Sequence, residues 1–239
     1  TFEPMDAITH GASTGSALPP IVKNMLGFSA NYKGDATNSK NRSANIPPHL
    51  STSLYLTNIP NGCSVKNLLD ALTLHGPFGK IYQVYISPGT PENGYSTSAA
   101  KIAMFTRQAA ESLFVFVREG RLSMGGYVVR AAWNRVLVPE QERRGSYYLS
   151  RVLVIEGPKK IVSFENLERF LRSRIVYQLQ NVKILEETGP TSEEEEEEAQ
   201  MEWVFGSYRA QAQTAKMALK RRWPELSVRH GVDPVAVGL

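Results

Sequence analysis

Apolar residues recur with two different periods along residues 54–133, and the order of these periods predicts strand, helix, strand, strand, helix, strand. Where the period is two, successive side chains point to opposite faces, so Leu54 and Leu56 lie on one face and Tyr55 on the other. Where apolar residues recur every three or four positions, a helix with one buried face is predicted. The predicted strands are 54–59, 80–86, 99–105 and 127–133, and the helices lie between Ser64 and Gly76 and between Thr106 and Gly120.

The same order of elements recurs in a second unit. Its predicted strands are 152–155, 177–185, 201–208 and 226–229, with helices after Ser163 and before Trp223. A βαββαβ chain forms a four-stranded antiparallel sheet with both helices on one face, which is the ferredoxin-like arrangement. We therefore expect an α+β protein with two ferredoxin-like domains, each leaving one sheet face open.

Changes in composition set the expected boundaries between these units. Residues rich in Gly, Pro, Ser and Asn precede the first unit, and six consecutive glutamates interrupt the second. We expect an extended or disordered segment at 1–49, a first domain at 50–136, a linker at 137–148, a second domain at 149–232 with an acidic loop at 186–198, and a C-terminal tail at 233–239.

One segment carries a family resemblance. The run Leu54-Tyr55-Leu56-Thr57-Asn58-Ile59 resembles the hexamer motif on the first strand of RNA-recognition motif (RRM) domains, and the resemblance extends over roughly residues 50–232. It is strong in the first domain and degenerate in the second. The resemblance implies non-catalytic binding of single-stranded RNA, with aromatic rings of the open face stacked on unpaired bases, in mRNA processing or post-transcriptional regulation.

The resemblance and the alternation together select candidate RNA contacts in the first domain. If Ala100, Ile102 and Met104 face the core, Lys101 lies on the open face beside Tyr55 and can meet a phosphate. A one-residue shift in register would turn several of the other candidates inward. The complete set of predicted RNA contacts in this domain is Tyr55, Asn58, Gln83, Tyr85, Lys101 and Arg130.

The second domain has a different distribution of aromatic residues. Val154 stands where the hexamer motif has its ring, whereas Trp203 and Phe205 are expected on the open face of the third strand. These rings would stack on bases or, alternatively, contact a protein partner or a second copy of the chain. The run Arg221-Arg222-Trp223 is similar to the Arg-x-Phe element of splicing-factor RRMs that bind a tryptophan-bearing peptide, which makes Arg221 and Trp223 the alternative peptide-binding residues.

Composition is consistent with these expectations and excludes others. The chain has 239 residues, a formal net charge of +4 and a sequence pI of about 9.1, which suits a nucleic-acid partner. The single cysteine, Cys63, rules out an internal disulfide, and no apolar run has the length of a membrane span, so we expect a reducing intracellular setting, nuclear or cytoplasmic. The four histidines are scattered and no catalytic motif accompanies them, so we expect no enzyme activity, metal, cofactor or small-molecule substrate.

Overall fold

The computed structural model describes residues 18–25, 43–141, 148–188 and 197–238. The first domain contains the elements β1 (Ser53–Ile59), α3 (Val65–His75), β2 (Ile81–Ser87), β3 (Ser98–Met104), α4 (Arg107–Arg118), β4 (Ser123–Met124), β5 (Tyr127–Val128) and β6 (Arg130–Trp133). The second contains β7 (Val152–Pro158), α5 (Phe164–Arg172), β8 (Leu179–Thr188), β9 (Glu198–Phe205), the π-helix η4 (Tyr208–Ala212), α6 (Gln213–Arg222) and β10 (Ser227–His230). Short helices lie outside these units: α2 (Pro20–Met25), η2 (Pro48–Leu50), η3 (Pro91–Asn93) and α7 (Pro234–Val237).

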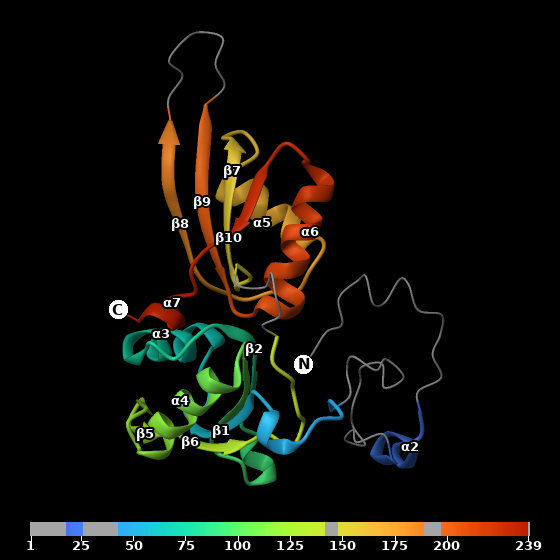
Figure 1. Ribbon diagram of the computed structural model, residues 1–239, viewed down its shortest axis with the longest axis vertical. Helices are drawn as coiled ribbons and strands as arrows, with labels where there is room; N and C mark the ends of the chain where they lie inside the picture. Colours follow the sequence, from blue (N-terminus) through green and yellow to red (C-terminus); the bar gives the residue numbers. More distant parts are fainter. Residues whose placement is uncertain (1–17, 26–42, 142–147, 189–196, 239) are drawn as a thin grey trace.

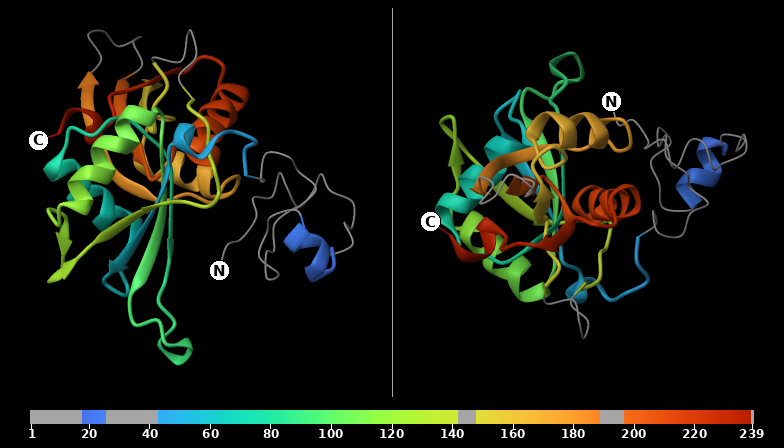
Figure 2. Two further views of the ribbon diagram at one scale, coloured as in Figure 1. Left: turned by 60° about the horizontal axis from the view of Figure 1, so that its bottom comes forward. Right: turned by 90° about the horizontal axis from the view of Figure 1, so that it is seen from above.

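Each domain is built on a four-stranded antiparallel sheet, and the two sheets have equivalent strand orders. The order is β2-β3-β1-β6 in the first domain and β10-β7-β9-β8 in the second, so the first and third strands of each unit occupy the centre. Helices α3 and α4 pack on one face of the first sheet, and α5 and α6 pack on one face of the second (Figures 1 and 2). The predicted α+β class with two ferredoxin-like domains is confirmed.

Local sequence signals explain where the first-domain helices begin. The Ser64 side chain accepts a hydrogen bond from the Asn67 N–H, and the Asn67 side chain accepts one from the Ser64 N–H, which forms a reciprocal cap on α3. The Thr106 hydroxyl accepts from the Ala109 N–H and caps α4. Below these caps, the apolar stripes of both helices join the inward residues of the sheet in one core, which includes Leu54, Leu56, Leu68, Leu72, Ile102, Ala110 and Leu113.

Several element boundaries differ from those that the pattern predicts. The last strand of the first domain is divided into β5 and β6, because Val129 interrupts the ladder. The third strand of the second domain ends at Phe205, and Tyr208 begins η4 instead. The expected acidic loop is partly strand, since β8 continues to Thr188 and β9 begins at Glu198; its central residues lie outside the described part of the chain.

The expected C-terminal tail instead folds onto the first domain. The Asp233 carboxylate accepts a hydrogen bond from the Val235 N–H and caps α7. Val235 is fully buried and belongs to the first domain's core, against α3 (Figure 1). A residue from the end of the chain therefore completes a core that is formed by its first half.

Polar contacts hold the domains together beside α7. The Ile81 N–H donates to Asp233 Oδ2 (2.9 Å), and Asp233 forms an ion pair with Arg151 in which neither side chain is exposed. The Ser207 hydroxyl accepts from the Val84 N–H at 2.9 Å, so η4 begins against the edge of β2. These buried contacts give the two domains a fixed relative orientation, unlike a pair joined only by a flexible linker.

Candidate nucleic-acid interface

Three predicted contacts lie side by side across the open face of the first domain. Lys101 on β3 is directly opposite Tyr55 on β1 and directly opposite Tyr85 on β2. Directly opposite residues of an antiparallel sheet share a face, with Cβ atoms about 4.5–5.5 Å apart. We call Tyr55, Lys101 and Tyr85 the ring row: two aromatic rings with one ammonium group between them.

The ring row is accessible to a ligand to different degrees. Tyr85 is 37% exposed, Lys101 is exposed and Tyr55 is partly covered. Ala132 on β6 lies opposite Tyr55 and completes the row with a methyl group. A small side chain beside a partly covered ring leaves the ring's face available for stacking.

Two more predicted contacts share this face. Gln83 lies opposite Ala103, two positions from Lys101, and Arg130 lies opposite Thr57 on β1. Residues two apart on a strand point to the same side, so both belong to the open face. The predicted register is therefore correct for every strand of this sheet, while RNA contact by these residues stays a prediction.

Asn58 has a more local role in the structure. Its backbone is in the left-handed region (φ 61°), where asparagine is better tolerated than most residues, at an irregularity in β1. Its Nδ2 donates to the Val128 carbonyl oxygen (2.8 Å) and so holds β5 against β1. Its donor group is thus engaged within the domain, and its predicted contact with RNA remains untested.

The placement predicted for Trp203 and Phe205 is wrong. Both side chains have no exposed surface and belong to the second domain's core, where the Trp203 ring stacks on Phe164 of α5 with 5.6 Å between centroids. Glu202 lies opposite Val154 and takes the open-face position instead. The register expected for β9 was off by one residue, because Val204 on the other face is also apolar and alternation alone cannot choose between two apolar faces.

Charged side chains dominate the open face of the second domain. Its central row runs Arg229, Val154, Glu202 and Lys183, from β10 across to β8. Val154 stands at the hexamer ring position, as the sequence predicts, and no ring takes its place in this row. The row can therefore form ionic contacts but has no aromatic ring on which a base can stack.

The alternative peptide-binding residues differ in their surroundings. Trp223 packs on Phe170 of α5 (4.7 Å between centroids) and on the second domain's core, and the Arg222 guanidinium lies over the Trp223 ring, 5.4 Å from its centroid. Arg221 is exposed. The Trp223 ring thus closes the end of its own domain, and peptide binding here stays a prediction.

Two further aromatic residues, one exposed and one facing the second domain, were not predicted as contacts. Tyr95, 68% exposed, lies in the connection between β2 and β3. Tyr82 lies at an irregularity between Ile81 and Gln83, which turns it toward the second domain. Strand alternation contains no signal for either position, because one is in a loop and the other follows a bulge.

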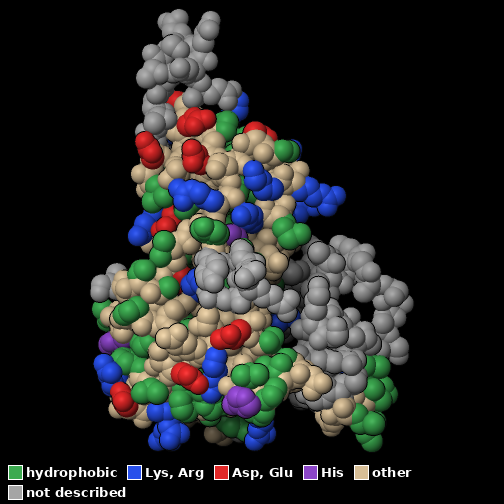
Figure 3. Space-filling view, viewed as in Figure 1, with side chains coloured by type: hydrophobic (Ala, Val, Ile, Leu, Met, Phe, Trp, Pro, Cys, Tyr) green, Lys and Arg blue, Asp and Glu red, His purple; other side chains and the backbone are tan. Residues whose placement is uncertain are grey.

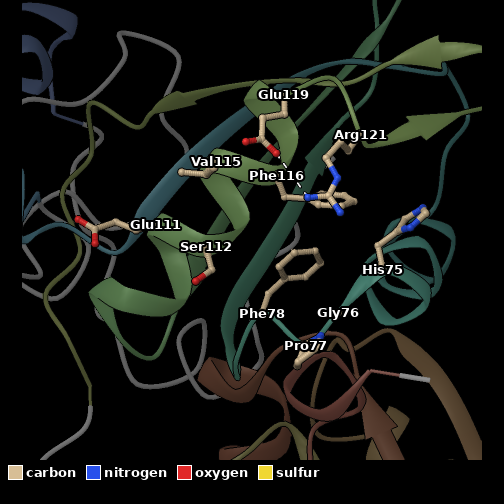
Figure 4. A pocket seen from close by; sticks show the side chains of 10 residues that line it. All are labelled: His75, Gly76, Pro77, Phe78, Glu111, Ser112, Val115, Phe116, Glu119 and Arg121. Atoms are coloured by element: carbon tan, nitrogen blue, oxygen red, sulfur yellow. Dashed lines mark hydrogen bonds and ion pairs between the residues drawn. The ribbon is translucent and has the colours of Figure 1, made fainter.

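A shallow hollow of about 520 Å³ lies on the opposite side of the first domain, between the end of α3 and α4 (Figure 4). Its apolar floor comes from Phe78 and Phe116, whose rings are 5.0 Å apart. Arg121 and Glu119 form an ion pair at its rim (3.4 Å). The third charged residue of its lining, Glu111, pairs with Arg107 of α4 (2.8 Å), so the hollow offers a partner mainly apolar surface.

Other site types find little support in the described residues. No group of three or more His, Cys, Asp or Glu side chains among them is arranged to hold a metal ion. None of their helices combines the length and the apolar character that crossing a bilayer requires.

Comparison with known proteins gives similarity at the level of fold. No protein-family profile matches the chain, and no curated protein sequence matches it. Similar solved structures include an Sxl-lethal protein/RNA complex, 15% identical over 76% of this chain and 99% of that chain (TM-score 0.28), and RRM domains 1 and 2 of Prp24 from S. cerevisiae, 10% identical over 76% and 96% (TM-score 0.28). A C. elegans NONO-1 homodimer is 16% identical over 78% of this chain and 63% of that chain (TM-score 0.26). The ferredoxin-like topology of both domains therefore rests on their own strand orders.

Proposed function

We propose that this protein binds single-stranded RNA without catalysis, through the open sheet face of its first domain. The observation that carries the proposal is the ring row, in which Tyr55 and Tyr85 flank Lys101 on the sheet face opposite the two helices of the first domain, α3 and α4. We further propose an intracellular role in mRNA processing or post-transcriptional regulation, in keeping with the resemblance to RRM proteins.

The chemistry of the row fits an unpaired strand better than a duplex. Stacking one base on a tyrosine ring contributes about 1–3 kcal/mol and is tolerant of sequence, because every base has a π-face. A base within a duplex already stacks on its neighbours and does not present this face. An unpaired strand is therefore the form of nucleic acid that the two rings of this row favour, and single-stranded RNA is the ligand that we propose.

The cations of the same face supply the second part of the interaction. Lys101 lies within the ring row. Arg130 lies two residues before Ala132 on β6 and therefore on the same side of the sheet. Lys and Arg neutralise phosphates and release counterions, so binding through this face weakens as salt increases. Gln83 adds an amide that can hydrogen-bond to a base edge.

The experiment is a fluorescence-anisotropy titration with a randomised single-stranded RNA pool and a matched duplex. We expect salt-sensitive binding of the single strand, weakened by about 1–3 kcal/mol in Tyr55→Ala. Val115→Ala is the matched control, since Val115 is 52% exposed on α4, on the opposite side of the sheet. Equal affinity of Tyr55→Ala and the unaltered protein, with the fold intact, would overturn the proposal.

One observation favours a second function for the second domain. Its open face lacks stacking rings in the central row and alternates positive and negative side chains, as Arg229, Glu202 and Lys183 show. Such a surface suits a charged protein partner or a second copy of this chain better than RNA. Analytical ultracentrifugation of the protein alone tests self-association; a monomer at all concentrations would leave only a different protein as the partner.

A further inference from the structure

A second group of rings lies where the first domain's open face meets the second domain. Phe105 follows β3, and its ring contacts Tyr82 of β2 (5.6 Å between centroids) and Tyr208 of η4 (5.2 Å). Because Phe105 comes one position after the core residue Met104, its side chain lies on the open-face side of the sheet. The open face of the first domain therefore leads directly onto η4.

Cationic side chains from both domains surround these rings. Lys80 Nζ lies 4.8 Å from the centre of the Phe105 ring. Arg209 is next to Tyr208 in sequence, and its charge lowers the pKa of the Tyr82 hydroxyl, although burial raises that pKa by more. The first domain thus contributes one cation and η4 contributes another to the same junction.

His230 and Lys216 form the second domain's side of the junction. The His230 ring lies 5.7 Å from Tyr208, and its buried Nδ1 has no hydrogen-bond partner. Burial, and then the charges of Lys216 and Lys80, lower the pKa of the His230 imidazole, while the backbone of Ser150 and Val152 acts in the opposite direction. Lys216 lies on α6, which packs against the strand β10 that carries His230.

Lys216 itself is in an unusual position for a lysine. It is half-buried, and among the described residues it makes no hydrogen bond or ion pair. Burial, and then the charge of Lys220, lower its pKa, and an anion beside it would act in the opposite direction. Figure 3 shows Lys and Arg side chains gathered over β10 and α6, with acidic side chains nearer the hairpin end of the domain.

We propose that the junction formed by Lys80, Arg209 and Lys216 binds a backbone phosphate of the RNA strand that crosses the ring row. A phosphate here places its negative charge beside two ammonium groups and one guanidinium group. This inference rests on the proposed function, because the ring row supplies the strand. It adds that the RNA continues from the first domain along η4 and α6 of the second domain.

Acidic side chains on the open sheet face of the second domain also favour a path for the RNA along η4. A strand that crossed the second domain's open sheet face would meet Glu202 in the central row and Glu156 beside it, bonded to Gln200. Carboxylates repel phosphates, whereas the junction presents cations from η4, from α6 and from the residue that precedes β2. The route along η4 is thus electrostatically favoured over the sheet.

The first test compares the salt dependence of RNA binding between two lysine variants. We expect Lys216→Ala to reduce the magnitude of the slope of log affinity against log salt by about 0.7, the value for one phosphate contact on a single strand, and Lys216→Arg to restore it. Lys183→Ala is the matched control, because Lys183 lies on the open sheet face of the same domain. An unchanged slope in Lys216→Ala, or an equal reduction in Lys183→Ala, would overturn the proposed route.

The second test uses an anion that has no bases. Inorganic tripolyphosphate is titrated into the full chain while the ring resonances of His230 are followed by NMR. We expect a saturable shift that Lys216→Ala weakens and Tyr55→Ala leaves unchanged; the absence of a shift overturns the junction site. The shift caused by tripolyphosphate does not depend on base stacking. The RNA titration therefore tests the ring row, and the tripolyphosphate titration tests the junction separately.

Discussion

Arg151 and Asp233 form an ion pair at 2.9 Å in which both side chains are completely excluded from solvent, at the boundary between the two domains. Asp233 also accepts from the Ile81 N–H of the first domain, and the Arg151 guanidinium donates to Gln180, which in turn donates to Asp70 of α3 (2.9 Å). One arginine thus connects the start of the second sheet with both the end of the chain and a helix of the first domain.

Removing one partner of this pair should damage the whole protein. We expect Asp233→Ala to lower the free energy of unfolding by about 3–5 kcal/mol, because Arg151 would remain buried without a counter-charge. Denaturant titration measures this change. The exposed pair between Lys66 and Asp70 is the comparison, and Lys66→Ala should cost no more than about 1 kcal/mol. Equal losses in the two variants would show that burial of the Arg151 pair is unimportant.

Trp203 should act as a core residue and not as an RNA contact. We expect Trp203→Ala to destabilise the second domain by about 3–5 kcal/mol, because its ring fills space against Phe164 and Phe205. Thermal unfolding followed by circular dichroism measures the loss. A variant of normal stability with reduced RNA affinity would contradict the buried placement.

Lys101 should contribute to affinity through charge. We expect Lys101→Ala to reduce the salt slope of RNA binding by about 0.7–1, with little change in stability because the side chain is exposed. Anisotropy titrations at several salt concentrations give the slope. Lys66→Ala, on helix α3, provides the control, and a slope equal to that of the unaltered protein would exclude a phosphate contact at Lys101.

Stability should depend on pH through His230. The folded-state pKa is lowered from the ordinary value of 6.5, chiefly by burial, so the unfolded chain binds the proton more readily. Below pH 6.5 the stability contributed by neutral His230 is progressively lost, until the pH falls below the folded-state pKa. Melting temperatures measured between neutral and mildly acidic pH should fall less in His230→Gln; parallel profiles would contradict the prediction.

The first domain follows from its sequence because its large apolar side chains lie on one side of the central strands, with alanines as the only apolar residues on the other side of β3 and β6. Leu54 and Leu56 alternate with polar or amphipathic neighbours, so the faces of Tyr55 and Lys101 were determined by burial alone. In β9, Trp203 and Val204 are both apolar, and the pattern permitted two registers. The register in the structure is the one that packs the Trp203 ring on Phe164 of α5, a contact between distant segments that the local pattern does not contain.

The junction between the domains could not be predicted from local patterns. The contact of Asp233 with Ile81 joins residues 152 positions apart, and no spacing rule covers such a distance. The segment around Val235 is expected to be a tail because four residues are too few for a hydrophobic period. Tyr82 was missed for a related reason, since a bulge reverses the face that alternation assigns.

The burial of Val235 in the first domain's core has a consequence for the order of events on the ribosome. Domains usually fold as units during synthesis, the N-terminal one first. Here the first sheet and its helices emerge with a gap beside α3 that only residues 233–237 fill, about 100 residues after Trp133 has been added. Part of the first domain's apolar core therefore stays uncovered until α7 has been synthesised.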